Sequence, residues 1–306
     1  MLEQPSVGDR NQLPTRSDNR IAIMQQPIVC FLLVIIGVVA GAPGFNGRII
    51  GGTPVTPDPD GLVTEYPYVV SIEDDLNHFC GGFIYNPKWV VTSASCMENK
   101  VISRLTVVAG QMNLIDAEKT EERRPVFKVI PYSTYNNVTR KDDIALIELS
   151  TNFTLDTQAR DLIKFNEVNT DADSTPPGTF LGWGATVLGG GFSPRLRHAE
   201  VTMVENNPVC NPYTPDEFTI SSMICAATMP VTLPSGDAEP TPCALDDGSP
   251  LVQTYLGTDG PITIVVGVLS KYSPICDSAD SSVFTRLSVY YAWLYRTAGE
   301  QVYTTP

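Results

Sequence analysis

Few side chains in this sequence are suited to acid–base catalysis near neutral pH. Histidine is the usual general base, and the chain has only His78, in HFCGG, and His198, in LRHAEV. Carboxylates stand at two other notable places, with Asp143 opening DIALIEL and Asp247 lying inside CALDDGSPLV. No C-x-x-C pair or His-rich cluster indicates zinc. We therefore expect no metal site and no other cofactor.

The charge balance narrows the range of partners. The 306-residue chain carries 34 acidic residues against 20 Lys and Arg, for a formal net charge of -14. Nucleic acids and anionic membrane surfaces need clustered positive charge on the protein. The sequence therefore disfavours both as partners, and the acidity favours solubility.

The N-terminus predicts a secreted protein. Ile28–Ala42 is an almost unbroken apolar run of 15 residues, and it ends in the small residues Ala40, Gly41 and Ala42 that signal peptidase favours. A spanning helix needs about 20 residues. We interpret residues 1–42 as an N-terminal lead and signal peptide, cleaved after Ala42. Translation from either Met1 or Met24 fits this reading, and a signal anchor remains an alternative.

The cysteines fit an oxidising compartment. Of seven, Cys30 lies in the apolar run and would leave with the signal peptide. The remaining six form an even set that predicts three disulfides but leaves their connectivity open. They are Cys80, Cys96, Cys210, Cys225, Cys243 and Cys276.

The elements that must position these residues are mostly strands. Short β-rich runs separated by Gly, Pro, Asn and Asp clusters indicate an all-β sandwich or barrel. Six such runs are 68–72, 80–85, 105–109, 144–149, 262–269 and 283–287. Only 289–297 has helical spacing, before the stop signal Gly299. The Pro-rich stretch 229–242 predicts a long surface loop.

Six motifs, in order along the chain, resemble those of the chymotrypsin/trypsin-like serine proteases. They are RIIGG at 48–52, YPYVVSI with HFCGG at 66–82, WVVTSASC at 89–96, DIALIEL at 143–149, GWG at 182–184 and CALDDGSPLV at 243–252. The resemblance implies an all-β fold of two packed six-stranded antiparallel β-barrels, with the active-site cleft between them and a C-terminal helix. It also implies an activation propeptide at 43–48 and a protease-like domain at 49–306.

The resemblance further implies roles for single residues. It pairs Cys80 with Cys96, Cys210 with Cys225 and Cys243 with Cys276. His78 matches a common non-catalytic position of the family. Arg48–Ile49 resembles the bond that is cleaved in zymogens, and Asp246 matches the carboxylate that then pairs with the new N-terminal amine.

The departures from the family pattern concern catalysis itself. Serine proteolysis needs a hydroxyl nucleophile, an imidazole base and a carboxylate that orients the imidazole. Asp143 matches the carboxylate, but Ser95 stands at the position of the imidazole and Asp247 at that of the nucleophile. Leu245 replaces a glycine whose N–H belongs to the oxyanion hole, which puts the geometry of that hole in doubt.

The substrate pocket is altered as well. Thr241 stands at its base, where it cannot neutralise a Lys or Arg side chain. Ser270 and Tyr272 lie in the stretch that matches one wall, and Tyr272 would push a large ring toward the mouth. Ser282 replaces a glycine of the second wall.

The sequence therefore predicts a secreted, non-catalytic serine protease homolog that binds or regulates other proteins. Its expected partners are a protease, an inhibitor or a defence-pathway component, besides a trypsin-like protease that would cleave Arg48–Ile49. An active trypsin-like endopeptidase is the alternative. A membrane-tethered protein is a third, but cleavage after Arg48 would release the domain, so no stable anchor is expected. Asn137 and Asn152 begin glycosylation sequons.

Overall fold

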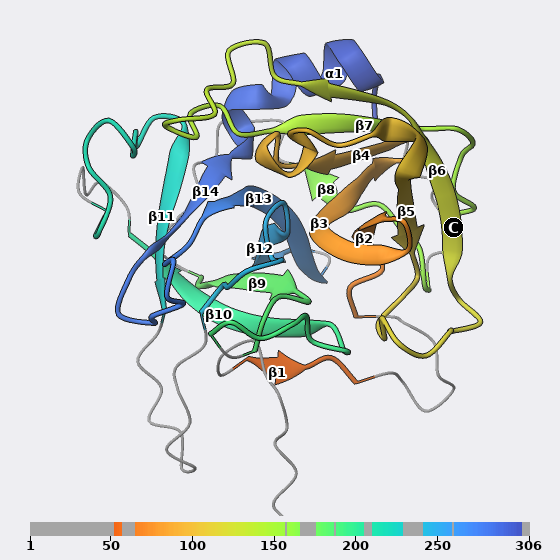
Figure 1. Cartoon of the computed structure of the whole chain (residues 1–306), viewed down its shortest axis with the longest axis horizontal. Helices are drawn as coiled ribbons and strands as arrows, with labels where there is room; N and C mark the ends of the chain where they lie inside the picture. The colour runs from red at the N-terminus through yellow and green to blue at the C-terminus, as the bar shows by residue number, and fades with distance from the viewer. Residues whose placement is uncertain are drawn as a thin grey trace, which may run out of the picture. The chain divides into compact units, whose positions relative to one another are not determined.

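Two closed six-stranded antiparallel β-barrels form the described part of the chain (Figure 1). The computed structural model describes residues 52–56, 65–156, 158–165, 176–186, 188–204, 210–228, 241–258 and 260–301. The predicted signal peptide, the propeptide, Arg48, Ile49 and most of the Pro-rich stretch lie outside these residues. The all-β, two-barrel prediction is confirmed.

The first barrel uses the strands that precede residue 150. Its order is β2-β3-β4-β7-β6-β5, with β5 pairing back onto β2. The strands are β2 (Val69–Asp74), β3 (Asn77–Asn86), β4 (Trp89–Thr92), β5 (Leu105–Ala109), β6 (Glu122–Pro131) and β7 (Ala145–Leu149). Val and Ile side chains fill its interior, because branched side chains pack well on a pleated sheet.

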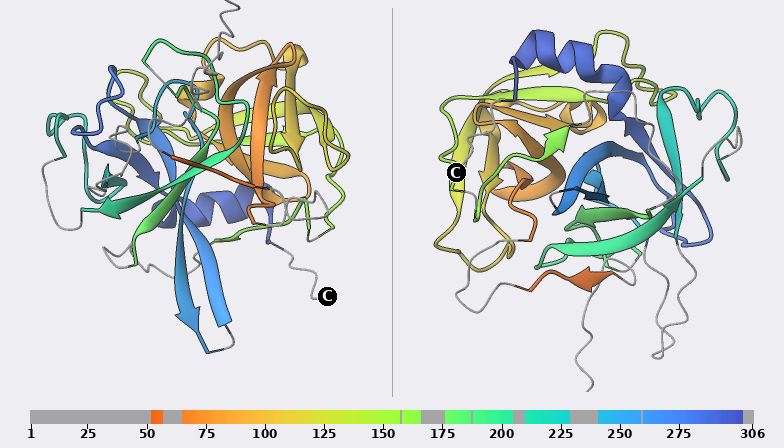
Figure 2. Two further views of the ribbon diagram at one scale, coloured as in Figure 1. Left: turned by 90° about the horizontal axis from the view of Figure 1, so that it is seen from below. Right: turned by 180° about the vertical axis from the view of Figure 1, so that it is seen from behind.

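The second barrel closes in the order β9-β10-β11-β14-β13-β12, with β12 pairing back onto β9. Its strands are β9 (Gly178–Gly182), β10 (Arg197–Met203), β11 (Met223–Thr228), β12 (Pro250–Gly257), β13 (Gly260–Lys271) and β14 (Ser282–Arg286). The short strands β1 (Thr53–Pro54) and β8 (Lys164–Phe165) add to β10 and β13. Figure 2 shows the β12–β13 hairpin projecting from the barrel.

The largest apolar cluster joins the two barrels and the C-terminal helix. It includes Phe83 of β3, Trp183 after β9 and Leu294 of helix α1 (Tyr291–Ala298). The helix follows the 3₁₀ turn η3 (Leu287–Tyr290), and the helical prediction for this segment is confirmed. The helix ends at Ala298, and the next residue, Gly299, has a positive φ of 82° that favours glycine.

The helix belongs to the end of the chain but packs on the first barrel. Tyr85 of β3 donates its hydroxyl to the carbonyl of Gly299, and Asn86 donates to that of Ala298. The end of the second barrel is thereby tied to the first.

Three disulfides link the pairs that the resemblance implies, Cys80–Cys96, Cys210–Cys225 and Cys243–Cys276. The first anchors the 3₁₀ turn η1 (Ser95–Met97) to β3. The third holds the segment that carries Asp246 and Asp247 beside the loop after β13.

Candidate active site

The carboxylate of Asp143 lies between the two barrels, in the loop just before β7. It is fully buried. Its Oδ1 accepts the backbone N–H of Ser95 at 2.7 Å, and its Oδ2 accepts the hydroxyls of Ser95 at 2.9 Å and Ser270 at 2.7 Å. Burial raises the pKa of Asp143, and these donors together with Arg140 oppose the rise.

Those two serines come from different barrels. Ser95 opens the turn η1 after β4, whereas Ser270 lies near the end of β13. One buried carboxylate therefore joins residues that are remote in the sequence. The structure brings Ser95 and Asp143 together, as their assignment to neighbouring positions of one site requires.

Asp247 approaches the same centre from the turn before β12. Its side chain keeps 20% of its surface exposed. Burial raises its pKa to about 6, and the nearby charge of Asp143 adds to the rise, while Arg140 and a hydrogen bond from the Tyr272 hydroxyl oppose it. Tyr272, expected in the pocket wall, thus contacts Asp247.

Arg140 connects the two carboxylates, and sequence reasoning missed it. Its Nη1 lies 3.5 Å from Oδ2 of Asp143 and 3.6 Å from Oδ1 of Asp247. The same atom donates to the carbonyl of Ser270 at 3.4 Å. The carboxylates outweigh the effect of burial, so the pKa of Arg140 is raised. Its position three residues before Asp143 was the one available signal.

We use the name central cluster for the residues joined by these contacts. They are Ser95, Arg140, Asp143, Asp247, Ser270 and Tyr272. Two carboxylates face one guanidinium there. Of the predicted pocket residues, Thr241 and Ser282 are buried, and no described contact joins them to this cluster.

Neither histidine takes part in the central cluster. His78 is buried, which lowers its pKa to about 4, so it is neutral at neutral pH. Its Nε2 donates to the carbonyl of Leu245 at 3.2 Å, and its Nδ1 accepts the hydroxyl of Ser71 at 2.8 Å. His198 pairs with Thr53 across β10 and β1.

His78 supports an unusual backbone conformation at Leu245. The φ of Leu245 is 76°, in the left-handed region that glycine adopts without steric cost. For a residue with a Cβ this costs about 1–2 kcal/mol. The loop therefore keeps the conformation suited to glycine, although a leucine occupies it.

Asp246 is a second buried carboxylate and has a different environment. Its Oδ1 accepts the N–H of Gly184 at 2.6 Å, and its Oδ2 accepts the N–H of Cys243 at 3.0 Å. A side chain at Gly182 or Gly184 would collide with this carboxylate, which explains why both ends of the GWG motif are glycine. Burial raises the pKa of Asp246 to about 7. No cation in the described ranges pairs with it.

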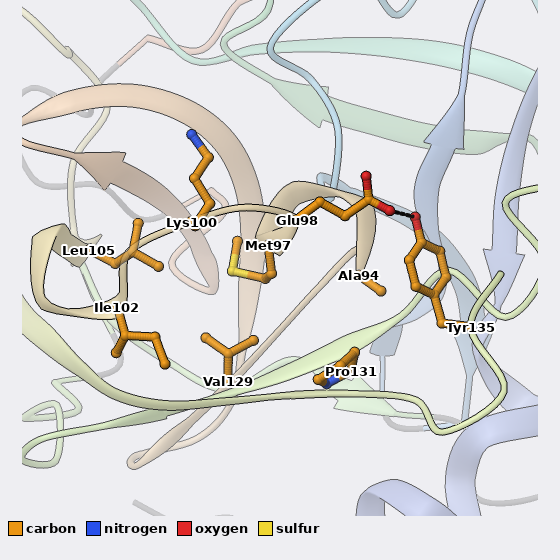
Figure 3. A pocket seen from close by; sticks show the side chains of 9 residues that line it. All are labelled: Ala94, Met97, Glu98, Lys100, Ile102, Leu105, Val129, Pro131 and Tyr135. Atoms are coloured by element: carbon orange, nitrogen blue, oxygen red, sulfur yellow. Dashed lines mark hydrogen bonds between the residues drawn. The ribbon is translucent and has the colours of Figure 1, made fainter. Parts of the chain in front are cut away.

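A separate cavity of about 270 Å³ lies beside η1 (Figure 3). Met97, Ile102, Leu105 and Val129 are among its apolar lining residues, and Ala94 lines it directly before Ser95. At one edge the Tyr135 hydroxyl donates to Glu98 at 2.9 Å. None of the four predicted pocket residues lines this cavity.

A family model described as Trypsin matches residues 49–294. The chain belongs to the trypsin family. It is 32% identical to coagulation factor IX of Oryctolagus cuniculus over 250 residues, which cover 80% of this chain and 83% of that protein. It is 31% identical to chymotrypsin-like elastase family member 1 of Felis catus over 260 residues, which cover 82% of this chain and 90% of that protein.

At the central cluster Ser95 contacts Asp143, and Arg140 lies between Asp143 and Asp247. The cluster therefore contains a carboxylate pair bridged by a cation. In the residues described, no helix is long and apolar enough to span a bilayer.

Replacing Arg140 should cost stability, because it leaves two carboxylates close together without their shared cation. We expect Arg140→Met to lower the free energy of unfolding by about 1–2 kcal/mol, a value reduced for the partial exposure of Arg140. Urea denaturation measures it. Lys88→Met, which breaks the surface pair with Glu148, is the matched control and should cost less than about 0.5 kcal/mol. Equal losses would contradict the bridging role.

The buried carboxyl of Asp246 should make the uncleaved chain less stable as pH rises. Its folded pKa of about 7 exceeds its ordinary 3.8, so the folded state holds the extra proton between these values. The stabilisation is complete below the ordinary pKa and is lost as pH rises through about 7. This group should account for about 4 kcal/mol between pH 4 and pH 8.

Chemical denaturation across this pH range, on wild type and Asp246→Asn, measures that slope. The variant should have the flatter profile, whatever its stability at any single pH. Parallel profiles for the two proteins would contradict the assignment.

Proposed function

We propose that this chain is a secreted, non-catalytic member of the trypsin family that acts as a binding or regulatory protein. The observation that carries the proposal is the guanidinium of Arg140, which lies between Asp143 and Asp247. A working triad would need an imidazole on Asp143 and a hydroxyl at the position of Asp247.

Neither substitute can perform the missing step. The Ser95 hydroxyl cannot act as a base near neutral pH. Asp247 is already engaged by Arg140 and Tyr272, and its negative charge opposes an oxyanion developing nearby. In a convergent serine protease, removal of the nucleophile or base alone lowers turnover by about 10⁶-fold. The alternative, an active endopeptidase, is favoured only by family membership.

Processing at Arg48–Ile49 is part of the proposal. Asp246 supports it, because this buried carboxyl has two backbone donors and no described cation. Cleavage by a trypsin-like protease would release the amine of Ile49, which would supply one. A protease, an inhibitor or a defence-pathway component is the expected partner.

A serine-directed fluorophosphonate probe distinguishes the two functions. We expect no labelling of this protein before or after treatment with trypsin, because in the described residues neither Ser95 nor Ser270 has an imidazole beside it. Intact mass spectrometry measures the adduct, and trypsin itself is the positive control. Stoichiometric labelling of a serine in the central cluster would contradict the proposal.

Restoring the triad residue types should not restore turnover. Ser95→His with Asp247→Ser supplies an imidazole and a hydroxyl. Arg140 would still pair with Asp143 and occupy the space between positions 143 and 247. We expect no measurable cleavage of arginyl peptides, since Thr241 offers no countercharge. Adding Arg140→Leu and Tyr272→Gly should raise hydrolysis of small esters.

Chromogenic ester and amide substrates measure this series. Arg140→Leu with Tyr272→Gly, without the triad changes, is the control and should remain inactive. If the first double variant alone cleaves arginyl peptides at rates near those of ordinary trypsins, Arg140 is not an obstacle and only the triad substitutions silence the protein.

A further inference from the structure

The loop that carries Arg140 also carries an exposed glycosylation sequon. Asn137, Val138 and Thr139 form the triplet, and the exposed fraction of Val138 is 83%. Asn137 is exposed too, and its side-chain amide has no hydrogen-bond partner among the residues that the structure describes. An N-linked sugar could be attached there without disturbing any described contact.

The turn around this sequon is held by its own hydrogen bonds. Oδ1 of Asn136 accepts the N–H groups of Val138 and Thr139, each at 2.9 Å. The backbone of Asn136 also bonds to Arg140 and Lys141. The attachment point therefore has a defined place relative to Arg140.

That place is beside the central cluster. Asn137 and Arg140 are three residues apart, which the chain can span by at most about 11 Å. On the other side of the sequon, Tyr135 bonds to Glu98, directly after η1, the turn that carries Ser95 (Figure 3). The loop thus belongs to the cluster through Arg140 and contacts the end of the neighbouring turn through Tyr135, and Asn137 lies between these two residues in sequence.

The second sequon provides a contrast. Phe153 at its centre is buried, and Thr154 bonds to Glu122. Asn152 follows the end of β7, whereas Asp143 precedes its start. The five-residue strand that lies between Asn152 and Asp143 is about 16 Å long.

We infer that Asn137 carries an N-linked glycan that shields the central cluster from folded proteins. The inference rests on the proposed secretion, because N-glycans are a modification of secreted chains. Arg140 occupies the space between the carboxylates of Asp143 and Asp247, and the glycan covers the central cluster on the solvent side. A folded partner of the glycosylated protein must then bind another surface, whereas small molecules still reach the cluster.

Occupancy is tested on protein secreted from a eukaryotic host behind a heterologous signal peptide. Enzymatic deglycosylation in heavy-oxygen water, followed by peptide mass spectrometry, should mark Asn137. Asn137→Gln and Thr139→Ala should lose this glycan, and Thr139→Ser should keep it. An unmodified Asn137 in the secreted wild type would overturn the inference.

Shielding is tested by the rate at which trypsin cleaves after Arg140 or Lys141, relative to cleavage after exposed Lys119 on another loop. The ratio should be several-fold higher for Asn137→Gln and Thr139→Ala than for wild type, Thr139→Ser and Asn152→Gln. Equal ratios in all five proteins would overturn the shielding role. The heterologous signal peptide and the fluorophosphonate assay keep this result separate from failure of the proposed function.

Discussion

The buried carboxylate of Asp143 is the interaction on which the centre of the molecule depends. It receives three hydrogen bonds, two from Ser95 of the first barrel and one from Ser270 of the second. A charge buried without partners is strongly unfavourable, so these donors must stay in place. The constraint fixes η1 against β13 whether or not the site performs catalysis. The carboxylate therefore has a structural role that does not depend on the proposed loss of the imidazole.

Charge then decides what else occupies the centre. Asp247 adds a second carboxylate close to the first, and like charges in a partly buried site disfavour each other. Arg140 compensates for both with one guanidinium. A neutral hydroxyl and imidazole would need no such cation. Asp143, Arg140 and Asp247 therefore form one ion network.

Asp246 stands apart from that network, although it is the neighbour of Asp247 in the sequence. Backbone donors hold its oxygens, but no described cation balances its charge, and burial raises its pKa to about 7. Two adjacent acidic residues thus have different surroundings, because an arginine contacts Asp247 whereas the described donors to Asp246 are backbone N–H groups. Both raised pKa values make stability fall as pH rises, and the shift is larger for Asp246 than for Asp247.

The sequence by itself determined the local features, namely the strand runs of both barrels, the C-terminal helix before Gly299, and the residue types at positions 95, 143 and 247. These depend on short-range patterns of side chains, and the motif resemblance placed them in order. Only the tertiary structure decided that Arg140 joins Asp143 to Asp247. It also decided that Leu245 adopts a positive φ and that its carbonyl accepts a hydrogen bond from His78. Arg140 and Asp247 are more than a hundred residues apart, and His78 and Leu245 are farther still. Such contacts arise only when two closed barrels pack together, which no local pattern encodes.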